Sequence, residues 1–83
     1  MNIKVLGPGC HNCKTLHKAT EEAVAALHKE GEVQIEYVQN MDEIQKFPIF
    51  ATPGLVIDGE VVHQGKPLPN AQRIQELIQS RSH

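Results

Sequence analysis

Aromatic residues are scarce in this 83-residue chain, which has no tryptophan, one tyrosine and two phenylalanines. A core built on large aromatic side chains is therefore excluded, and isoleucine, valine, leucine and alanine must fill it. Hydrophobic residues make up 40% of the sequence, which is enough for one modest core but not for two. The sequence contains no internal repeat or linker. We therefore expect a single domain over residues 1–83.

The chain also lacks an excess of charge and a long apolar run. Its formal net charge is −2 and its pI is near 6.2, which gives no electrostatic basis for binding nucleic acid or an anionic membrane. No apolar run approaches the roughly 18 residues of a membrane span. The apolar stretch at residues 2–6 is too short for the core of a signal peptide. These absences predict a cytoplasmic protein without a membrane partner.

Cysteine occurs only twice, in the motif Cys10-His11-Asn12-Cys13, directly after Gly7-Pro8-Gly9. Residues i and i+3 are neighbours on a helix, so thiols at this spacing can close a disulfide within one turn. The unpaired N–H groups and the positive dipole end of a first helical turn favour a thiolate. In the cytosol, an isolated CxxC motif indicates redox activity or metal binding rather than a structural disulfide.

The hydrophobic periodicity predicts seven secondary-structure elements. Residues 33–38 alternate apolar and polar side chains with a period of two, and the expected helices repeat apolar residues every three or four positions. The other strands are short apolar runs bounded by glycine, proline or Asp-Gly turn residues, which completes the seven elements. The seven are a strand at 2–6, a helix at 11–30 stopped by Gly31, a strand at 33–38, a short helix from the Asn40 cap to Lys46, strands at 54–57 and 60–63 joined by Asp58-Gly59, and a last helix capped by Asn70.

This β-α-β-α-β-β-α order predicts an α/β fold. A strand–helix–strand unit gives a right-handed parallel crossover, and the hairpin adds an antiparallel pair. We expect a four-stranded mixed sheet with helices on both faces.

The order, with CxxC opening the first helix and Thr52-Pro53 just before the third strand, resembles the thioredoxin fold along the whole chain. More narrowly, the sequence is similar to the small redox-active disulfide proteins, which are short thioredoxin/glutaredoxin-like proteins. The residues that match this family lie at 9–14, 51–59 and 65–66. The chain departs from thioredoxins in having Gly9 where they carry tryptophan, and His11-Asn12 where they carry Gly-Pro.

The resemblance implies a thiol–disulfide oxidoreductase that acts as a protein disulfide reductase without a cofactor. Cys10 would attack the substrate disulfide and Cys13 would resolve the mixed disulfide. A cis Thr52–Pro53 bond would pack beside them, and Gly65 would let the substrate backbone approach. A proline that opens a strand lacks an N–H, which leaves the neighbouring backbone free to pair with an extended substrate.

His11 and Asn12, between the cysteines, are expected to tune the reduction potential. The expected partners are a disulfide-containing protein substrate and a reductase that returns the protein to its dithiol form. Nucleic acid is not an expected partner, and we expect a monomer.

Two other functions remain open at the level of sequence. Thiolate pairs suit Cu(I) or Zn(II), and His17, one turn past Cys13, could supply a third ligand. The order of elements, however, differs from the β-α-β-β-α-β order of copper-chaperone domains, so we predict no metal site. His17, His28 and His63 are then scaffold residues. The other alternative is an adaptor whose partner binds one oxidation state without electron transfer.

Overall fold

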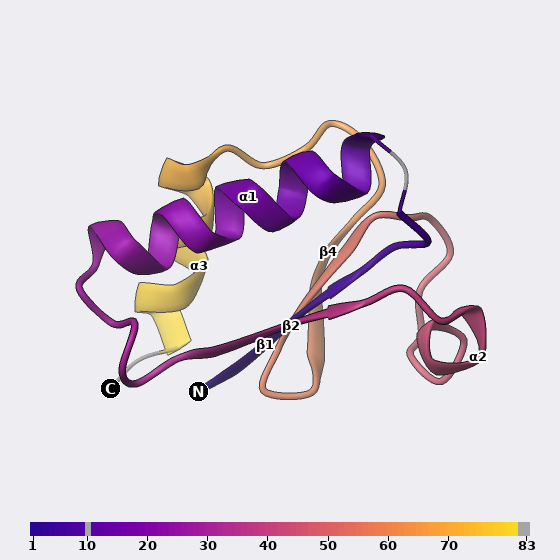
Figure 1. The fold of residues 1–83 in the computed structure, drawn as a ribbon, viewed down its shortest axis with the longest axis horizontal. Helices are drawn as coiled ribbons and strands as arrows, with labels where there is room; N and C mark the ends of the chain where they lie inside the picture. Colours follow the sequence, from indigo (N-terminus) through magenta and orange to yellow (C-terminus); the bar gives the residue numbers. More distant parts are fainter. Residues whose placement is uncertain (10, 82–83) are drawn as a thin grey trace.

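A four-stranded mixed sheet forms the centre of the molecule (Figure 1). The structure is a computed structural model, and it describes residues 1–9 and 11–81. The strands are β1 (Asn2–Leu6), β2 (Gln34–Val38), β3 (Gly54–Ile57) and β4 (Glu60–Gln64), in the spatial order β2-β1-β3-β4. Strands β1 and β2 run parallel, whereas β1–β3 and β3–β4 are antiparallel. The predicted crossover and hairpin are both confirmed.

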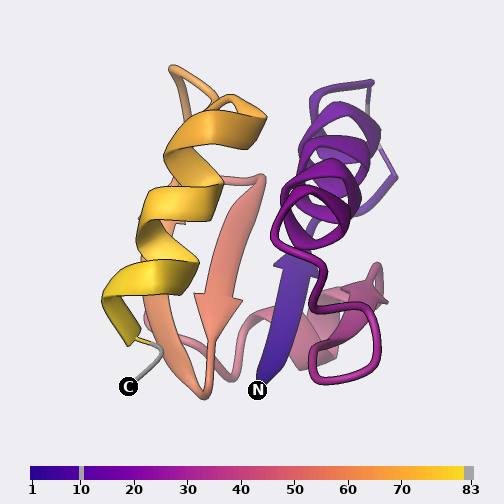
Figure 2. The same ribbon diagram turned by 90° about the vertical axis from the view of Figure 1, so that its left-hand side faces the viewer.

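In the described residues, three helices cover the two faces of this sheet: α1 (His11–Ala26), α2 (Met41–Ile44) and α3 (Ala71–Arg81). Helices α1 and α3 lie side by side on one face, as Figure 2 shows. The short helix α2 packs on the other face, where its Ile44 belongs to the same buried cluster as Leu6. The predicted α/β fold, a four-stranded mixed sheet with helices on both faces, is confirmed.

Alternation along the strands divides the core into two aliphatic clusters. Ile3 and Val5 of β1 face α1 and α3, whereas Leu6 faces α2. Lys4 points to the α2 face, and its ammonium group lies 5.5 Å from the centre of the Phe47 ring. The larger cluster, beneath α1 and α3, contains Ile3, Val5, Leu16, Ala23, Val24, Val33, Leu55, Ile57, Ile74 and Ile78. The scarcity of aromatic residues thus produces an aliphatic core, as predicted.

Helix α1 ends earlier than the sequence predicts. We expected it to reach Glu30 and to stop at Gly31, but it ends at Ala26. His28 adopts a left-handed conformation with φ 55°. The His28 N–H donates to the Ala25 carbonyl at 3.0 Å, and the Lys29 N–H donates to the Val24 carbonyl at 3.1 Å. These are the two bonds of a Schellman cap, so a histidine takes the place usually filled by glycine.

Helix α2 is also shorter than predicted, because it ends at Ile44 rather than at Lys46. Its cap is confirmed: the Asp42 N–H donates to Asn40 Oδ1 at 2.8 Å. Beyond Ile44 the backbone bonds tighten from the i−4 to the i−3 pattern, as in Lys46 N–H to the Glu43 carbonyl at 3.2 Å. The strand boundaries differ by one residue, since β2 begins at Gln34 and β4 extends to Gln64.

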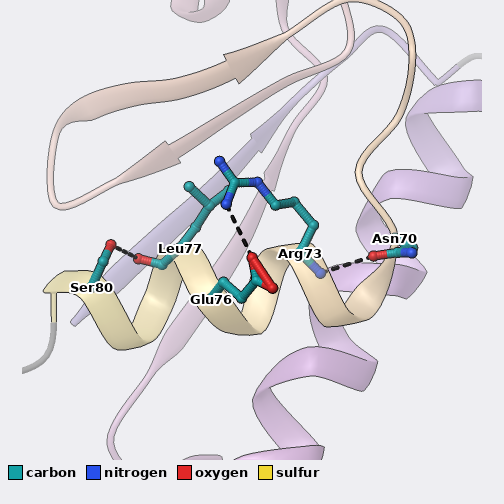
Figure 3. Close-up of polar contacts among 5 residues, drawn as sticks. All are labelled: Asn70, Arg73, Glu76, Leu77 and Ser80. Atoms are coloured by element: carbon teal, nitrogen blue, oxygen red, sulfur yellow. Dashed lines mark hydrogen bonds and ion pairs between the residues drawn. The ribbon is translucent and has the colours of Figure 1, made fainter.

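The structure contains the predicted Asp58-Gly59 turn and the predicted Asn70 cap in the last third of the chain. Asp58 and Gly59 have φ values of 50° and 85°, which fit the two-residue hairpin turn that Asp-Gly favours. Asn70 caps α3 by accepting the Arg73 N–H at 2.8 Å, as Figure 3 shows. Figure 3 also shows the Arg73–Glu76 ion pair on the exposed side of the helix. In the described part of the chain, no helix is long and apolar enough to span a membrane.

Candidate functional site

Three residues line up across one end of the sheet. The register pairs Leu6 with Gly54 and Gly54 with Gln64. Continued by one position, it places Gly7 beside Pro53 and Pro53 beside Gly65. The Gly65 N–H donates to the Pro53 carbonyl at 2.9 Å, which fixes the second of these neighbours. We call Gly7, Pro53 and Gly65 the end row.

Cys13, in the first turn of α1, packs against Gly7 of this end row. Its side chain is fully buried, and the residue is disulfide-bonded. A Cβ atom at Gly7 would collide with the Cys13 sulfur and would lie 2.7 Å from the Cys13 Cβ. Gly7 therefore has no side chain because Cys13 occupies that space. Figure 1 shows α1 starting at the end of the sheet where β1 finishes and β3 starts.

Of the other three residues of the motif, the structure describes His11 and Asn12. Cys10 lies outside the described residues. His11, the first residue of α1, is exposed, and its carbonyl accepts the Thr15 hydroxyl at 3.0 Å. Asn12 is half-buried. The described first turn of α1 carries no acidic side chain, so no carboxylate there offsets the positive end of the helix dipole.

The segment that leads into β3 presents an exposed residue followed by a buried one. Thr52 is exposed and Pro53 is fully buried, and the peptide bond between them is cis. A second cis bond, which the sequence did not predict, joins Lys66 to Pro67.

Gly65 is required at its position for two reasons. Its φ is +72°, a conformation that favours glycine. A Cβ there would also lie 3.0 Å from the Cβ of Ala51. The His63 Nε2 lies 3.0 Å from the Gly65 carbonyl oxygen, so this histidine supports the loop as a scaffold residue. Gly65 and Pro53, both predicted as site residues, are thus brought together.

Gly7 is a site residue that the sequence analysis missed. The sequence predicts for it only a place in the Gly7-Pro8-Gly9 segment that terminates the first strand. The signal was present, because a glycine that directly follows a buried strand and precedes a helix often marks a close approach of backbone or side chain. Which atoms approach could not be read without the register of β1 and β3.

His17 packs as part of the scaffold. Its ring stacks on Tyr37 of β2 with centroids 4.7 Å apart, and its Nδ1 lies 3.6 Å from Glu21 Oε1. Within residues 1–9 and 11–81, no three His, Cys, Asp or Glu side chains come close enough to hold a metal ion. The stack accounts for the half-buried position of the His17 ring.

Tyr37, beneath His17, has a shielded hydroxyl group with no hydrogen-bond partner among the described residues. Burial raises the pKa of this hydroxyl above its usual value of 10.0. Thr20 is the matched case: its hydroxyl is also buried, but it donates to the Leu16 carbonyl at 2.8 Å. Tyr37 thus has a hydroxyl group without a hydrogen bond, and Thr20 has a buried hydroxyl group with one.

We expect Tyr37→Phe to raise the free energy of unfolding by up to about 1 kcal/mol, because it removes an unsatisfied polar group. Thr20→Val should lower it by about 0.5–1.5 kcal/mol, because it removes a hydrogen bond. Urea unfolding followed by circular dichroism measures both. Since the folded pKa of Tyr37 is raised, its contribution is constant below pH 10.0 and wild-type stability falls above that pH. A destabilised Tyr37→Phe variant would contradict this account.

Comparison with known proteins identifies the class of this fold and site. The chain matches the thioredoxin domain family over residues 1–79. It is 39% identical over 78 residues to a thioredoxin of Methanothermobacter thermautotrophicus, covering 94% of this chain and 97% of that protein. It is 32% identical over 78 residues to a thioredoxin of Methanocaldococcus jannaschii, covering 94% and 86%. The chain therefore belongs to the thioredoxin family, and the predicted thioredoxin-like fold is confirmed. Membership supports thiol–disulfide oxidoreductase activity at the level of the family.

Proposed function

We propose that this protein reduces disulfides in other proteins through Cys10 and Cys13. The observation that carries the proposal is the packing of Cys13. It lies fully buried in the first turn of α1, against Gly7, which is the neighbour of Pro53 in the end row. A buried sulfur at this position is suited to a resolving role, because it reacts with a neighbouring sulfur rather than with a substrate in solvent.

The reaction consists of two thiol–disulfide exchanges. The Cys10 thiolate attacks one sulfur of the substrate disulfide, and the other substrate sulfur leaves as a thiolate that takes up a proton. Cys13 then loses its proton and attacks the Cys10 sulfur. The second substrate sulfur leaves, and a Cys10–Cys13 disulfide forms. The substrate has gained two electrons and two protons, which the protein has lost. A dithiol reductase must return them before the next cycle.

Thr52, Pro53 and Gly65 are proposed to hold the substrate during these steps. Thr52 is exposed beside the buried Pro53. An extended substrate segment can pair with the backbone of Thr52. Gly65 has no side chain to block this approach. His11 and Asn12 are proposed to tune the reduction potential. The reaction uses no cofactor, and we place it in the cytoplasm, with the protein acting as a monomer.

The reduction potential of the cysteine pair tests this function. Protein stripped of metal is equilibrated with thiol buffers of defined potential, and the free thiols are trapped and counted by mass spectrometry. A reversible two-electron transition near or below about −220 mV is expected for a cytoplasmic reductase. A much higher potential would indicate an oxidant or isomerase. Failure to form an intramolecular disulfide at any potential would overturn the redox function and make Cu(I) or Zn(II) uptake the next measurement.

A further inference from the structure

The most exposed large hydrophobic side chain of the described residues lies close to the candidate site. Phe50 is 94% exposed. Among the described residues, the only other exposed large hydrophobic side chain is that of Met41, at 46%. Phe50 stands three positions before Pro53. In a chain with so few aromatic residues, a solvent-exposed phenyl ring at this position requires an explanation other than packing.

Phe50 is one of the residues that line a groove of about 330 Å³. The groove extends from Met41 and Ile44 of α2 to Ala51 and Thr52. Thr52 therefore belongs both to this groove and to the proposed substrate-binding residues. A substrate segment that pairs beside Thr52 would bring its neighbouring side chains over the groove.

The backbone of Phe50 is fixed in place. Its N–H donates to Gln64 Oε1 of β4 at 2.6 Å. The preceding residue, Ile49, packs so closely on Gly54 that a Cβ at Gly54 would collide with the Ile49 Cδ1. The segment thus contacts β3 and β4, and the ring projects into solvent from it. A preformed contact surface lowers the entropic cost of binding.

We propose that Phe50 determines substrate specificity by binding an apolar side chain located two or three residues from the substrate disulfide. The inference rests on the proposed function. The size of the surface favours a transient substrate over a second copy of the chain. One exposed phenyl ring and a half-exposed methionine offer far less than the roughly 800 Å² per partner of a stable interface. A small apolar contact suits a substrate that must leave after each cycle.

Two disulfide-bridged peptides test this inference. They are identical except for one residue, leucine or serine, two positions before the first cysteine. Wild-type protein should reduce the leucine peptide with a kcat/KM about tenfold higher than the serine peptide. Phe50→Ser should remove this preference by slowing the leucine peptide alone, while Phe50→Leu should keep most of it. Equal rates of both peptides with wild-type protein, or an equal loss on both with Phe50→Ser, would overturn the inference.

Leu68 provides a matched control. It lines a second groove of about 410 Å³, between α1 and the segment before α3, and Thr52 is not among the residues of that groove. Leu68→Ser should leave the preference for leucine unchanged; loss of the preference in this variant would overturn the assignment to Phe50.

Thermal unfolding verifies that every variant folds. Light scattering should give a monomer with and without Phe50→Ser, and a dimer that this substitution dissolves would assign the surface to a second copy instead.

A binding measurement separates this inference from the proposed function. The same peptides are made with an unreactive thioether in place of the disulfide, and their binding is followed by titration. If the protein reduces neither peptide but binds the leucine thioether more tightly than the serine one, and Phe50→Ser abolishes the difference, the reductase function fails and the docking surface stands. Equal binding of both thioether peptides would overturn the surface even where reduction is observed.

Discussion

Cys10→Ser is expected to abolish disulfide reduction. Serine cannot supply a thiolate, so the first exchange has no nucleophile, and Cys13 is too buried to replace it. The rate of insulin reduction should fall to the uncatalysed background, a loss of at least about a thousandfold. The assay is insulin turbidity in the presence of a dithiol donor. Thr15→Ser, an exposed conservative change in the same helix, should remain within about twofold of wild type.

Cys13→Ser is expected to fail in a different way. Cys10 would still attack the substrate, but the mixed disulfide would not be resolved, so the protein should become covalently linked to its substrate. Non-reducing gels and mass spectrometry would show a one-to-one adduct that a reductant releases. Cys13→Ala is the control for misfolding, because it places no hydroxyl group in the buried site, and it should trap the same adduct. Turnover by both the Cys10 and Cys13 variants at the wild-type rate would contradict the mechanism.

The fold could be predicted because local patterns agree with one another along this chain. The short apolar runs at residues 2–6 and 54–57, the helical stripe of Leu16 and Val24, and the Asp58-Gly59 turn all indicate the same arrangement of layers. The asparagine caps depend only on neighbouring backbone groups, so they too could be read from sequence. Each of these features is decided within a few residues.

The features that could not be predicted depend on contacts between distant segments or on weak local preferences. The end of α1 is an example, since glycine is the usual residue for a left-handed cap and Gly31 was available, but His28 takes that conformation three residues earlier. Phe50 is another example: its ring is exposed, and its backbone N–H donates to Gln64, 14 residues away. The sequence shows an aromatic residue there but not whether it faces the core or the solvent.

Gly7 is the site residue whose role depends most on the tertiary structure, and its substitution should have a large effect. An added methyl group would collide with the sulfur of Cys13 and approach its Cβ to 2.7 Å. Both residues are buried, which leaves the new atom little room. We expect Gly7→Ala to lower the free energy of unfolding by about 1–3 kcal/mol, as overpacking of a core does. Gly31→Ala is the control, because no atom lies within 4 Å of its Cβ position.

The cause of the loss can be tested by a double-mutant cycle under reducing conditions, where the disulfide does not contribute. Cys13→Ala removes the sulfur that the new methyl group meets but keeps the Cβ that lies 2.7 Å from it, so Gly7→Ala should cost less in that background without becoming neutral, with a coupling energy of about 1 kcal/mol. Urea unfolding of the four proteins gives this value. If Gly7→Ala costs the same with and without the Cys13 sulfur, the loss has another origin. Under turnover, the single Gly7→Ala variant should also accumulate mixed disulfide, because displacement of Cys13 slows the resolving step while leaving the attack by Cys10 possible.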